Sequence, residues 1–416
     1  MISIDISALF FIQLTIVLAS CHAMGRIARY FGQPAVVGEM VAGVMLGPSL
    51  FGLVFPEFHA AIFRTDSMPI LYSLSQLGLT LYMFVVGIEF EVEDFRQHRK
   101  TAISVSITGM VAPFFLGGLI AVWLHGSGDY FLENITLYQA ILFMGASMSI
   151  TAFPMLARMI VENNLVGTSL GTLALAAGAI DDVAAWCVLA LILSSTNGDL
   201  TNFAVTTGGG IIYCVVVLSI LKPFLHRLTP IAEKHNKLTN GQLTLILAIV
   251  MLGASYTNAI GIHSVFGAFL IGCAIPRGIV CDRLKTQIEP ITLCLLVPLF
   301  FAYSGLKTRL DLVSTPWLLF VTLIVLIAAI IGKGVACWAA ARWTGESQGS
   351  AMALGSLMNA RGMMGLIVLI IGKENGIIGS ELFSILVLMA ILTTLAATPL
   401  FRWIQAHYPL FDDLKK

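Results

Sequence analysis

Two adjacent aspartates, Asp181 and Asp182, stand in the middle of a long apolar stretch, LALAAGAIDDVAAWCVLALIL. A charged residue at the centre of a bilayer costs about 2.5–3.5 kcal/mol on insertion scales, so it normally has a partner and a function. Because successive helical residues point about 100° apart, the two carboxylates cannot face the same way. One can face a water-filled cavity, where it can bind a cation or a proton, while the other faces a neighbouring helix.

Lys333 is the lysine that lies in the middle of another apolar stretch, LIAAIIGKGVACWAA. It is a natural partner for one of the two aspartates. A static ion pair that only fixes helix packing is the plainer interpretation of one aspartate and one lysine. That interpretation leaves the second aspartate unexplained, so the full set favours a functional carboxylate.

Two apolar stretches are interrupted by polar residues, Gly or Pro, in MGASMSITAFP and in GSLMNARGMMG. Unwound backbone exposes carbonyl oxygens and half-helix C-termini carry partial negative charge, and both suit a hard monovalent cation. Ser147, Ser149 and Thr151 of the first break are candidate ligands, although such hydroxyls often bond back to their own helix. Arg361 of the second break is expected to neutralise half-helix ends or a carboxylate rather than to contact the transported ion.

Three further polar residues are weaker candidates. Glu39 (VVGEMVAG) and Glu89 (VVGIEFEV) lie toward the ends of their apolar stretches and are possible secondary carboxylates and partners of Arg361. Glu89 equally suits snorkelling to the membrane interface. His263, in a short turn near the end of an apolar stretch, is a candidate pH sensor.

The composition of the chain indicates the class of protein that holds these residues. Of 416 residues, 58% are hydrophobic and 11% charged, whereas a soluble domain carries about a quarter charged residues. The chain is therefore expected to be an integral membrane protein of the lipid bilayer. The 23 basic and 23 acidic residues balance, which argues against nucleic-acid binding. No basic region precedes the first apolar stretch, so a cleaved signal peptide is not expected, and neither is a cofactor.

An all-α, polytopic fold follows, because a helix needs about 20 apolar residues to cross the hydrocarbon core. Thirteen spans are predicted, at residues 6–24, 34–54, 68–90, 101–124, 135–160, 168–195, 202–222, 240–259, 262–276, 286–305, 315–341, 349–371 and 381–403. Lys and Arg divide seventeen to four between the two sides if the N-terminus is outside. The bias of basic residues toward the cytoplasm therefore predicts an outer N-terminus and a cytoplasmic C-terminus.

The two breaks fall in the fifth and twelfth spans, seven spans apart. An odd offset gives the two halves opposite topology, which is the inverted-repeat arrangement of secondary transporters with a binding site at the midplane. A basic loop, KPFLHRLTPIAEKHNKLTN, separates the halves.

At these residues the chain resembles the monovalent cation/proton antiporters, in particular the branch with two adjacent aspartates. The matching stretches are GQPAVVGEMVAGVMLGPSLFG, FVVGIEFEVEDF, SMSITAFPMLARMIVENNL, AIDDVAAW, IIGKGVACW and MNARGMMGLIVL. The resemblance covers essentially the whole chain. Asp181 separates it from the related branch that has Asn-Asp at this place.

The resemblance implies that Asp182 binds cation and proton in turn, that Asp181 pairs with Lys333, and that the broken spans cross. It implies a moving core of residues 101–195 and 315–403, a dimerisation part of residues 1–100 and 240–305, and a linker helix at 202–222. The expected protein is a homodimer in a bacterial inner or plasma membrane. It exchanges Na⁺ or K⁺ for H⁺ in pH homeostasis, driven by the ion gradients.

Three alternatives stay open. Some relatives carry a C-terminal nucleotide-binding domain that gates K⁺ efflux; the end at LFDDLKK favours an ungated antiporter over a K⁺ efflux-type K⁺/H⁺ antiporter. An intramembrane aspartyl enzyme needs two carboxylates that face each other from two helices, whereas Asp181 and Asp182 are neighbours on one helix. A cation channel would conduct without coupling to protons. The chain is therefore expected not to be an enzyme.

Overall fold

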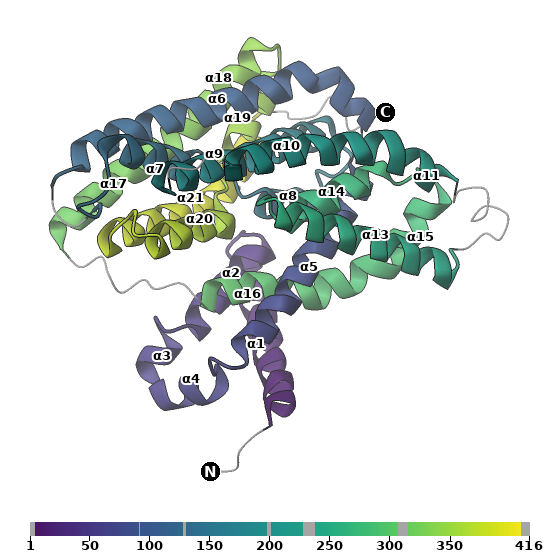
Figure 1. Cartoon of the computed structure of the whole chain (residues 1–416), viewed down its shortest axis with the longest axis horizontal. Helices are drawn as coiled ribbons and strands as arrows, with labels where there is room; N and C mark the ends of the chain where they lie inside the picture. The colour runs from purple at the N-terminus through teal and green to yellow at the C-terminus, as the bar shows by residue number, and fades with distance from the viewer. Residues whose placement is uncertain are drawn as a thin grey trace.

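The computed structural model describes residues 5–90, 92–127, 130–197, 201–227, 238–306 and 315–408, which are mostly helical (Figure 1). The first half forms α1 (Ile6–Tyr30), α2 (Ala35–Leu46), α3 (Phe51–Val54), α4 (Pro56–Ile62), α5 (Met68–Glu89), α6 (Val92–Leu124), α7 (Leu137–Ser149), α8 (Phe153–Glu162), α9 (Ser169–Asn197), α10 (Thr201–Val216) and α11 (Lys222–His226). The second half forms α13 (Asn240–Ala259), α14 (Ser264–Ala274), α15 (Ile279–Ile291), α16 (Val297–Leu306), α17 (Pro316–Ile330), α18 (Ala336–Trp343), α19 (Gln348–Leu357), α20 (Gly362–Glu374) and α21 (Ser380–His407).

The all-α expectation is confirmed, since the described residues contain no strand beyond one bridge between Phe131 and Ile378. Every predicted span coincides with helical structure. Eleven helical segments of the described chain are long and apolar enough to cross a membrane. The ninth expected span is the short α14, and the twelfth is divided between α19 and α20, so thirteen crossings stay a prediction.

Helix starts follow from local side chains. The Thr136 side chain accepts a hydrogen bond from the backbone N–H of Gln139, and the Gln139 side chain bonds back, which caps α7. Thr239 and Gln242 repeat this arrangement at α13. Such reciprocal bonds satisfy backbone donors that the first helical turn leaves without partners. These threonines therefore fix where the two helices begin.

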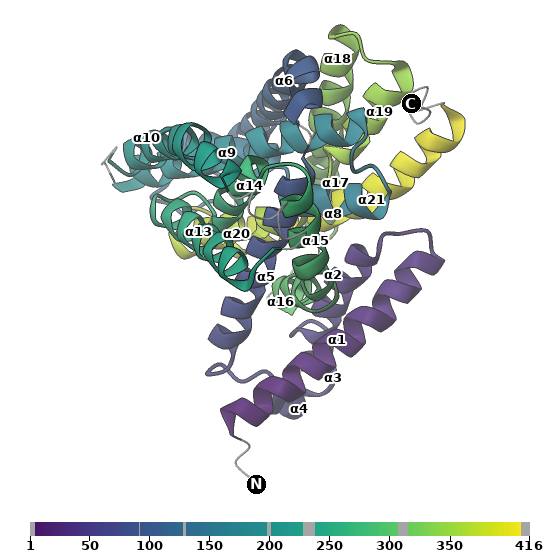
Figure 2. The same ribbon diagram turned by 90° about the vertical axis from the view of Figure 1, so that its right-hand side faces the viewer.

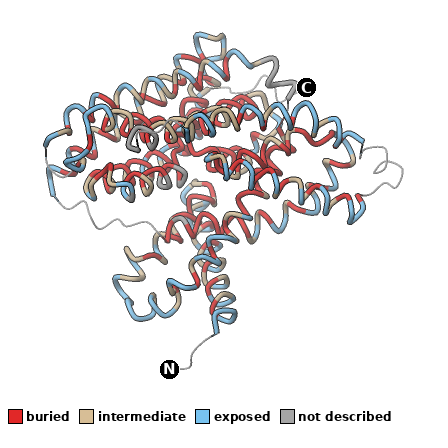
Figure 3. Tube along the Cα trace, in the orientation of Figure 1, coloured by how far each residue is buried: buried red, intermediate tan, exposed pale blue. Residues whose placement is uncertain are grey.

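The helices pack in two groups that meet near the middle of the molecule. In one group, α6 packs on α7, α9 and α18, and α21 packs on α17 and α19. In the other, α5 packs on α14 and α16, and α2 packs on α1 and α16. Helices α1, α2 and α16 lie below the first group in Figure 1 and Figure 2, while α14 lies beside α8 and α9. Buried residues concentrate where the groups meet, and exposed residues line the outer faces (Figure 3). Phe115, Ile211 and Leu252 are 64%, 61% and 72% exposed, as suits faces that contact lipid.

Among the described residues, three spans contain a π-helical turn: η1 (Val217–Leu221), η2 (Thr292–Leu296) and η3 (Ile331–Val335). A π turn inside an α-helix is uncommon and frequently lies at a functional site. The third carries Lys333 on the buried face of its span. Most of the basic loop between the halves (residues 228–237) and the LFDDLKK end lie outside the described residues.

Candidate functional site

The two broken spans cross at their breaks. Between α7 and α8 the chain is extended at Ile150 and Ala152, and Pro154 stands in the first turn of α8. The backbone N–H of Ala152 donates to the carbonyl of Ala360, between α19 and α20, at 3.0 Å. The crossing expected from the sequence is therefore present, with the non-helical backbone enclosed in protein.

Gly362 allows this close approach. Its φ is +45°, a left-handed conformation that L side chains rarely adopt, and an added Cβ would lie 2.9 Å from the Cβ of Ala152. The Thr394 hydroxyl accepts the backbone N–H groups of Arg361 and Gly362 at 3.2 and 2.8 Å. A hydroxyl from α21 thus caps the start of α20, where the interrupted helix leaves donors unsatisfied.

Asp181 lies at the crossing with both carboxylate oxygens occupied. Ser106 of α6 donates to Oδ1 at 2.5 Å, and Thr151 of the first break donates to Oδ2 at 2.8 Å. Lys333 Nζ donates to the same Oδ2 at 2.7 Å and to the Ser149 carbonyl at 2.5 Å. Asp181 and Lys333 are both completely buried. The structure therefore pairs Lys333 with Asp181, as the resemblance implies, and ties that pair to the unwound backbone.

Asp182 is as buried as Asp181 but is less completely hydrogen-bonded. Its side chain is 1% exposed, and its Oδ2 has no hydrogen-bond partner within the described part of the chain. A buried carboxylate with a free oxygen is costly to retain. It can bind a proton or a small cation.

Arg361 acts on the backbone, as expected. Its guanidinium donates to the carbonyl of Met148, at the C-terminal end of α7, and to that of Ala329 at 3.0 Å. A guanidinium at the carbonyl end of a half-helix neutralises its partial negative charge. Both contacts keep the side chain engaged within the crossing.

The three hydroxyls of the first break have separate environments. Thr151 is held by Asp181. Ser149 lies within donating distance of the carbonyls of Gly145 and Met110, at 2.7 and 2.8 Å, which includes the bond to its own helix. Ser147 is buried, and its hydroxyl has no partner among the described residues. The assignment of all three as cation ligands stays a prediction.

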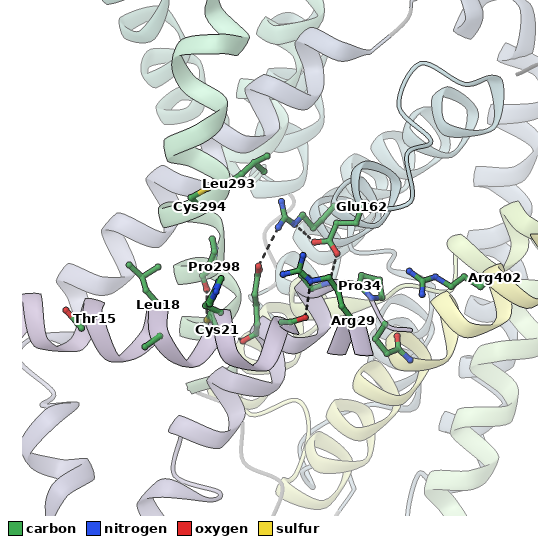
Figure 4. A pocket seen from close by; sticks show the side chains of 17 residues that line it. Thr15, Leu18, Cys21, Arg29, Pro34, Glu162, Leu293, Cys294, Pro298 and Arg402 are labelled. Carbon is green, nitrogen blue, oxygen red and sulfur yellow. Dashed lines mark hydrogen bonds and ion pairs between the residues drawn. The ribbon is translucent and has the colours of Figure 1, made fainter. Parts of the chain in front are cut away.

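A second charged cluster lines a cavity of about 830 Å³ between α1, α8 and α16 (Figure 4). Arg158 of α8 lies 3.5 Å from Glu39 of α2 and 2.8 Å from Glu162. The Glu162 carboxylate also accepts the backbone N–H of Ala35 at 2.5 Å. These contacts join the start of α2 to the end of α8.

The expectation that Arg361 pairs with Glu39 or Glu89 is wrong. Glu39 pairs with Arg158, and Glu89 pairs with Lys285 of α15. The physical reason is that each glutamate meets a basic residue at its own end of the bundle, while Arg361 is held by carbonyl groups at the crossing.

Sequence reasoning missed three residues of these sites. Arg158 and Glu162 are four residues apart on one helix, a spacing typical of an ion pair. Ser106 carries no comparable signal, because several Ser and Thr residues occur along α6.

Comparisons with known proteins agree with this arrangement. The family model described as "Sodium/hydrogen exchanger, transmembrane" matches residues 14–406. The chain is 38% identical over 390 residues to the Na⁺/H⁺ antiporter NhaS4 of Synechocystis sp., covering 93% of this chain and 95% of that protein. It is 33% identical over 414 residues to K⁺/H⁺ antiporter 1 of Saccharomyces cerevisiae, covering 96% of this chain and about half (46%) of the yeast protein.

The fold is similar to that of the sodium proton antiporter MjNhaP1 from Methanocaldococcus jannaschii. The TM-score is 0.67 at 14% sequence identity, and the match covers 97% of each chain. At this identity the likeness concerns the fold alone.

Proposed function

Because this chain belongs to the sodium/hydrogen exchanger family, we propose that Asp182 is the group that binds a monovalent cation and a proton in turn. The protein is a secondary active antiporter that exchanges Na⁺ or K⁺ for H⁺ across a membrane. One observation carries the assignment to Asp182. Both oxygens of Asp181 are occupied by donors, whereas Oδ2 of the equally buried Asp182 has no partner in the described chain.

Exchange requires one site that holds either ion but not both. An ionised Asp182 attracts a cation through its free oxygen, and a protonated Asp182 has no charge with which to hold one. If the loaded site is exposed to one side of the membrane at a time, the two flows are coupled. The ion gradients then supply the energy.

Alternating access needs two groups of helices that move relative to each other. We assign residues 101–195 and 315–403 to the moving core, 1–100 and 240–305 to a dimerisation part, and 202–222 to the linker. The two halves are proposed as inverted repeats in a homodimer. The N-terminus is proposed to lie outside a bacterial inner or plasma membrane, with the C-terminus in the cytoplasm.

The transported ion is proposed to be Na⁺, with K⁺ as the second candidate. The bacterial relative is named for Na⁺/H⁺ exchange, and the yeast relative for K⁺/H⁺ exchange. Measuring proton flux in vesicles that are given Na⁺, Li⁺ or K⁺ side by side distinguishes the two candidate ions. A K⁺-only response would favour the K⁺/H⁺ alternative.

The test of the site is Asp182→Asn, measured as fluorescence-detected proton flux in sealed vesicles with expression checked in parallel. Asparagine keeps the volume and the hydrogen-bonding capacity but cannot ionise, so cation-coupled proton flux should be lost at near-normal expression. Asp66→Asn is the matched control, because Asp66 forms an exposed pair with Arg64 far from the crossing. Normal exchange by a well-expressed Asp182→Asn variant would refute the assignment.

The same vesicles discriminate the other classes. A channel would give large cation currents that do not depend on a proton gradient. An aspartyl enzyme would need both carboxylates free to share a proton, and Asp181 is occupied by Lys333, Ser106 and Thr151. We therefore place neither activity at this site.

A further inference from the structure

The short connection between α1 and α2, residues 31–34, is bonded to the last helix of the fold. Nε2 of Gln33 donates a hydrogen bond to the carbonyl of Leu395 on α21 at 3.2 Å. In the other direction, Nη1 of Arg402 on α21 donates to the carbonyl of Gly32 at 2.5 Å. Each segment therefore supplies one side-chain donor and one backbone acceptor. We call these two hydrogen bonds the α1–α2 latch.

Local sequence explains both acceptors of the latch. Pro399 lies inside α21, and because proline has no backbone N–H, it cannot bond to the carbonyl of Leu395 four residues earlier. The Gln33 amide supplies the missing donor. Gly32 has a φ of +72°, which L side chains rarely adopt, and an added Cβ would lie 3.3 Å from Nη1 of Arg402. Proline and glycine thus open the two carbonyls to donors from the opposite segment.

A third contact lies beside the latch. The backbone N–H of Ala35, the first residue of α2, donates to Oε2 of Glu162 at the end of α8 at 2.5 Å. Pro34, Glu162 and Arg402 all line the cavity of about 830 Å³ (Figure 4). Residues 32–35 are therefore bonded to α8 and α21, while the two helices that they connect, α1 and α2, pack on α16.

The latch joins two units that the proposed function moves relative to each other. Gly32 and Gln33 belong to the dimerisation part, and Leu395 and Arg402 belong to the core. We propose that Gln33 and Arg402 are positioning residues of the exchange cycle: their hydrogen bonds hold the core against the dimerisation part, and they break when the site opens to the membrane face on which residues 31–34 lie. This inference rests on the proposed function. It adds the contacts that set the balance between the two access states.

The proposal has a signature that a simple folding defect lacks. The apparent affinity at one face scales with the fraction of molecules that are open to that face. Loss of a latch bond favours opening at the face of residues 31–34, so KM for the cation should fall there and rise at the opposite face. A variant that merely folds poorly has fewer active molecules, which lowers kcat at both faces and leaves both KM values unchanged.

The experiment measures Na⁺-dependent proton flux in right-side-out and inside-out vesicles, with Na⁺ added to the outer solution at one pH. KM and kcat are determined separately for each orientation. Gln33→Ala and Arg402→Ala each remove one hydrogen bond, so each should change the ratio of the two KM values about three- to tenfold, in the same direction. Arg402→Lys keeps a donor and should return the ratio toward that of the wild type.

Arg342→Ala is the matched control. The Arg342 guanidinium also donates to a backbone carbonyl at an exposed position, that of Glu346 at 2.5 Å, but both residues belong to the core. The KM ratio of this variant should equal that of the wild type. A wild-type ratio in both Gln33→Ala and Arg402→Ala, or an equal change in Arg342→Ala, would overturn the inference.

The inference and the proposed function fail in different ways. If Asp182→Asn abolishes exchange while both latch variants keep the wild-type KM ratio, only the inference fails. Normal exchange by a well-expressed Asp182→Asn variant would instead remove the proposed function.

Discussion

Two clusters of buried charge differ in how completely they are enclosed. At the crossing, Asp181 and Lys333 are fully buried, and every oxygen of the carboxylate has a donor. At the 830 Å³ cavity, Arg158 and Glu39 lie 3.5 Å apart and are 10% and 7% exposed. Glu39 Oε2 has no partner among the described residues.

The difference teaches which cluster can change during transport. The hydrogen-bond donors to Asp181 come from α6, from the break after α7 and from η3. All three are assigned to the moving core, so these contacts can persist while the core moves. The cluster at the cavity joins α2 to α8, which the proposed function places in different units. The first cluster is suited to hold a unit together, and the second is suited to rearrange as the units move.

The largest effect should come from Lys333→Ala. This change leaves Asp181 as an unpaired buried charge, and breaking a buried pair from one side typically costs about 3–5 kcal/mol. We expect a marked loss of thermal stability in detergent, with partial recovery when Asp181→Asn is added. If the stability losses of Lys333→Ala and Asp181→Asn simply add in the double variant, the two residues do not interact. The distinction between the two clusters then fails.

A smaller effect is expected for Ser106→Ala. It removes the donor to Asp181 Oδ1 while Lys333 remains in place, and an unsatisfied buried acceptor costs about 1–3 kcal/mol. The temperature at which Ser106→Ala unfolds should therefore lie between that of the wild type and that of Lys333→Ala. Ser73→Ala is the control, because the Ser73 hydroxyl donates to the Pro69 carbonyl of its own helix on an exposed face. If Ser106→Ala and Ser73→Ala unfold at the same temperature, the hydrogen-bond donors around Asp181 do not form the complete set described here.

The smallest stability effect is expected for Glu39→Gln. The 3.5 Å separation from Arg158 is long for an ion pair, and Arg158 retains Glu162 at 2.8 Å. The free energy of unfolding should change by less than about 1 kcal/mol, while the exchange rate should change because the contact joins two units. A stability loss as large as that of Ser106→Ala, with normal exchange, would contradict the contrast between the clusters.

Much of this arrangement follows from local sequence. Membrane spans can be predicted from the length and apolarity of a stretch alone. The breaks are marked by Pro154 and Gly362, whose effects on the backbone are local. Lys333 and Asp181 stand out because charge is rare in such stretches, and the structure pairs them.

What the sequence did not reveal depends on contacts between distant helices. Ser106 meets Asp181 across 75 positions, and Arg158 meets Glu39 across 119. Neither pairing has a periodic signature, and ordinary polar residues would fit at either place. The partners of Glu39 and Glu89 were mispredicted for the same reason: charge alone does not tell which end of the bundle a side chain shares.

The π turn at η3 has a consequence for how this chain tolerates changes of length. A π turn bonds residue i to i+5 and so takes one residue more than an α turn. On α18, Cys337 is buried and directs its thiol toward the Val105 carbonyl of α6 at 3.7 Å. Deleting a single residue from Ile331–Val335 would restore a plain α-helix and leave α18 close to its present rotation relative to α17, whereas the same deletion in the α-helical part of α17 would rotate all that follows by about 100°. In a scan of single-residue deletions, this stretch should therefore be more tolerant than the α-helical turns beside it, except at the buried Lys333.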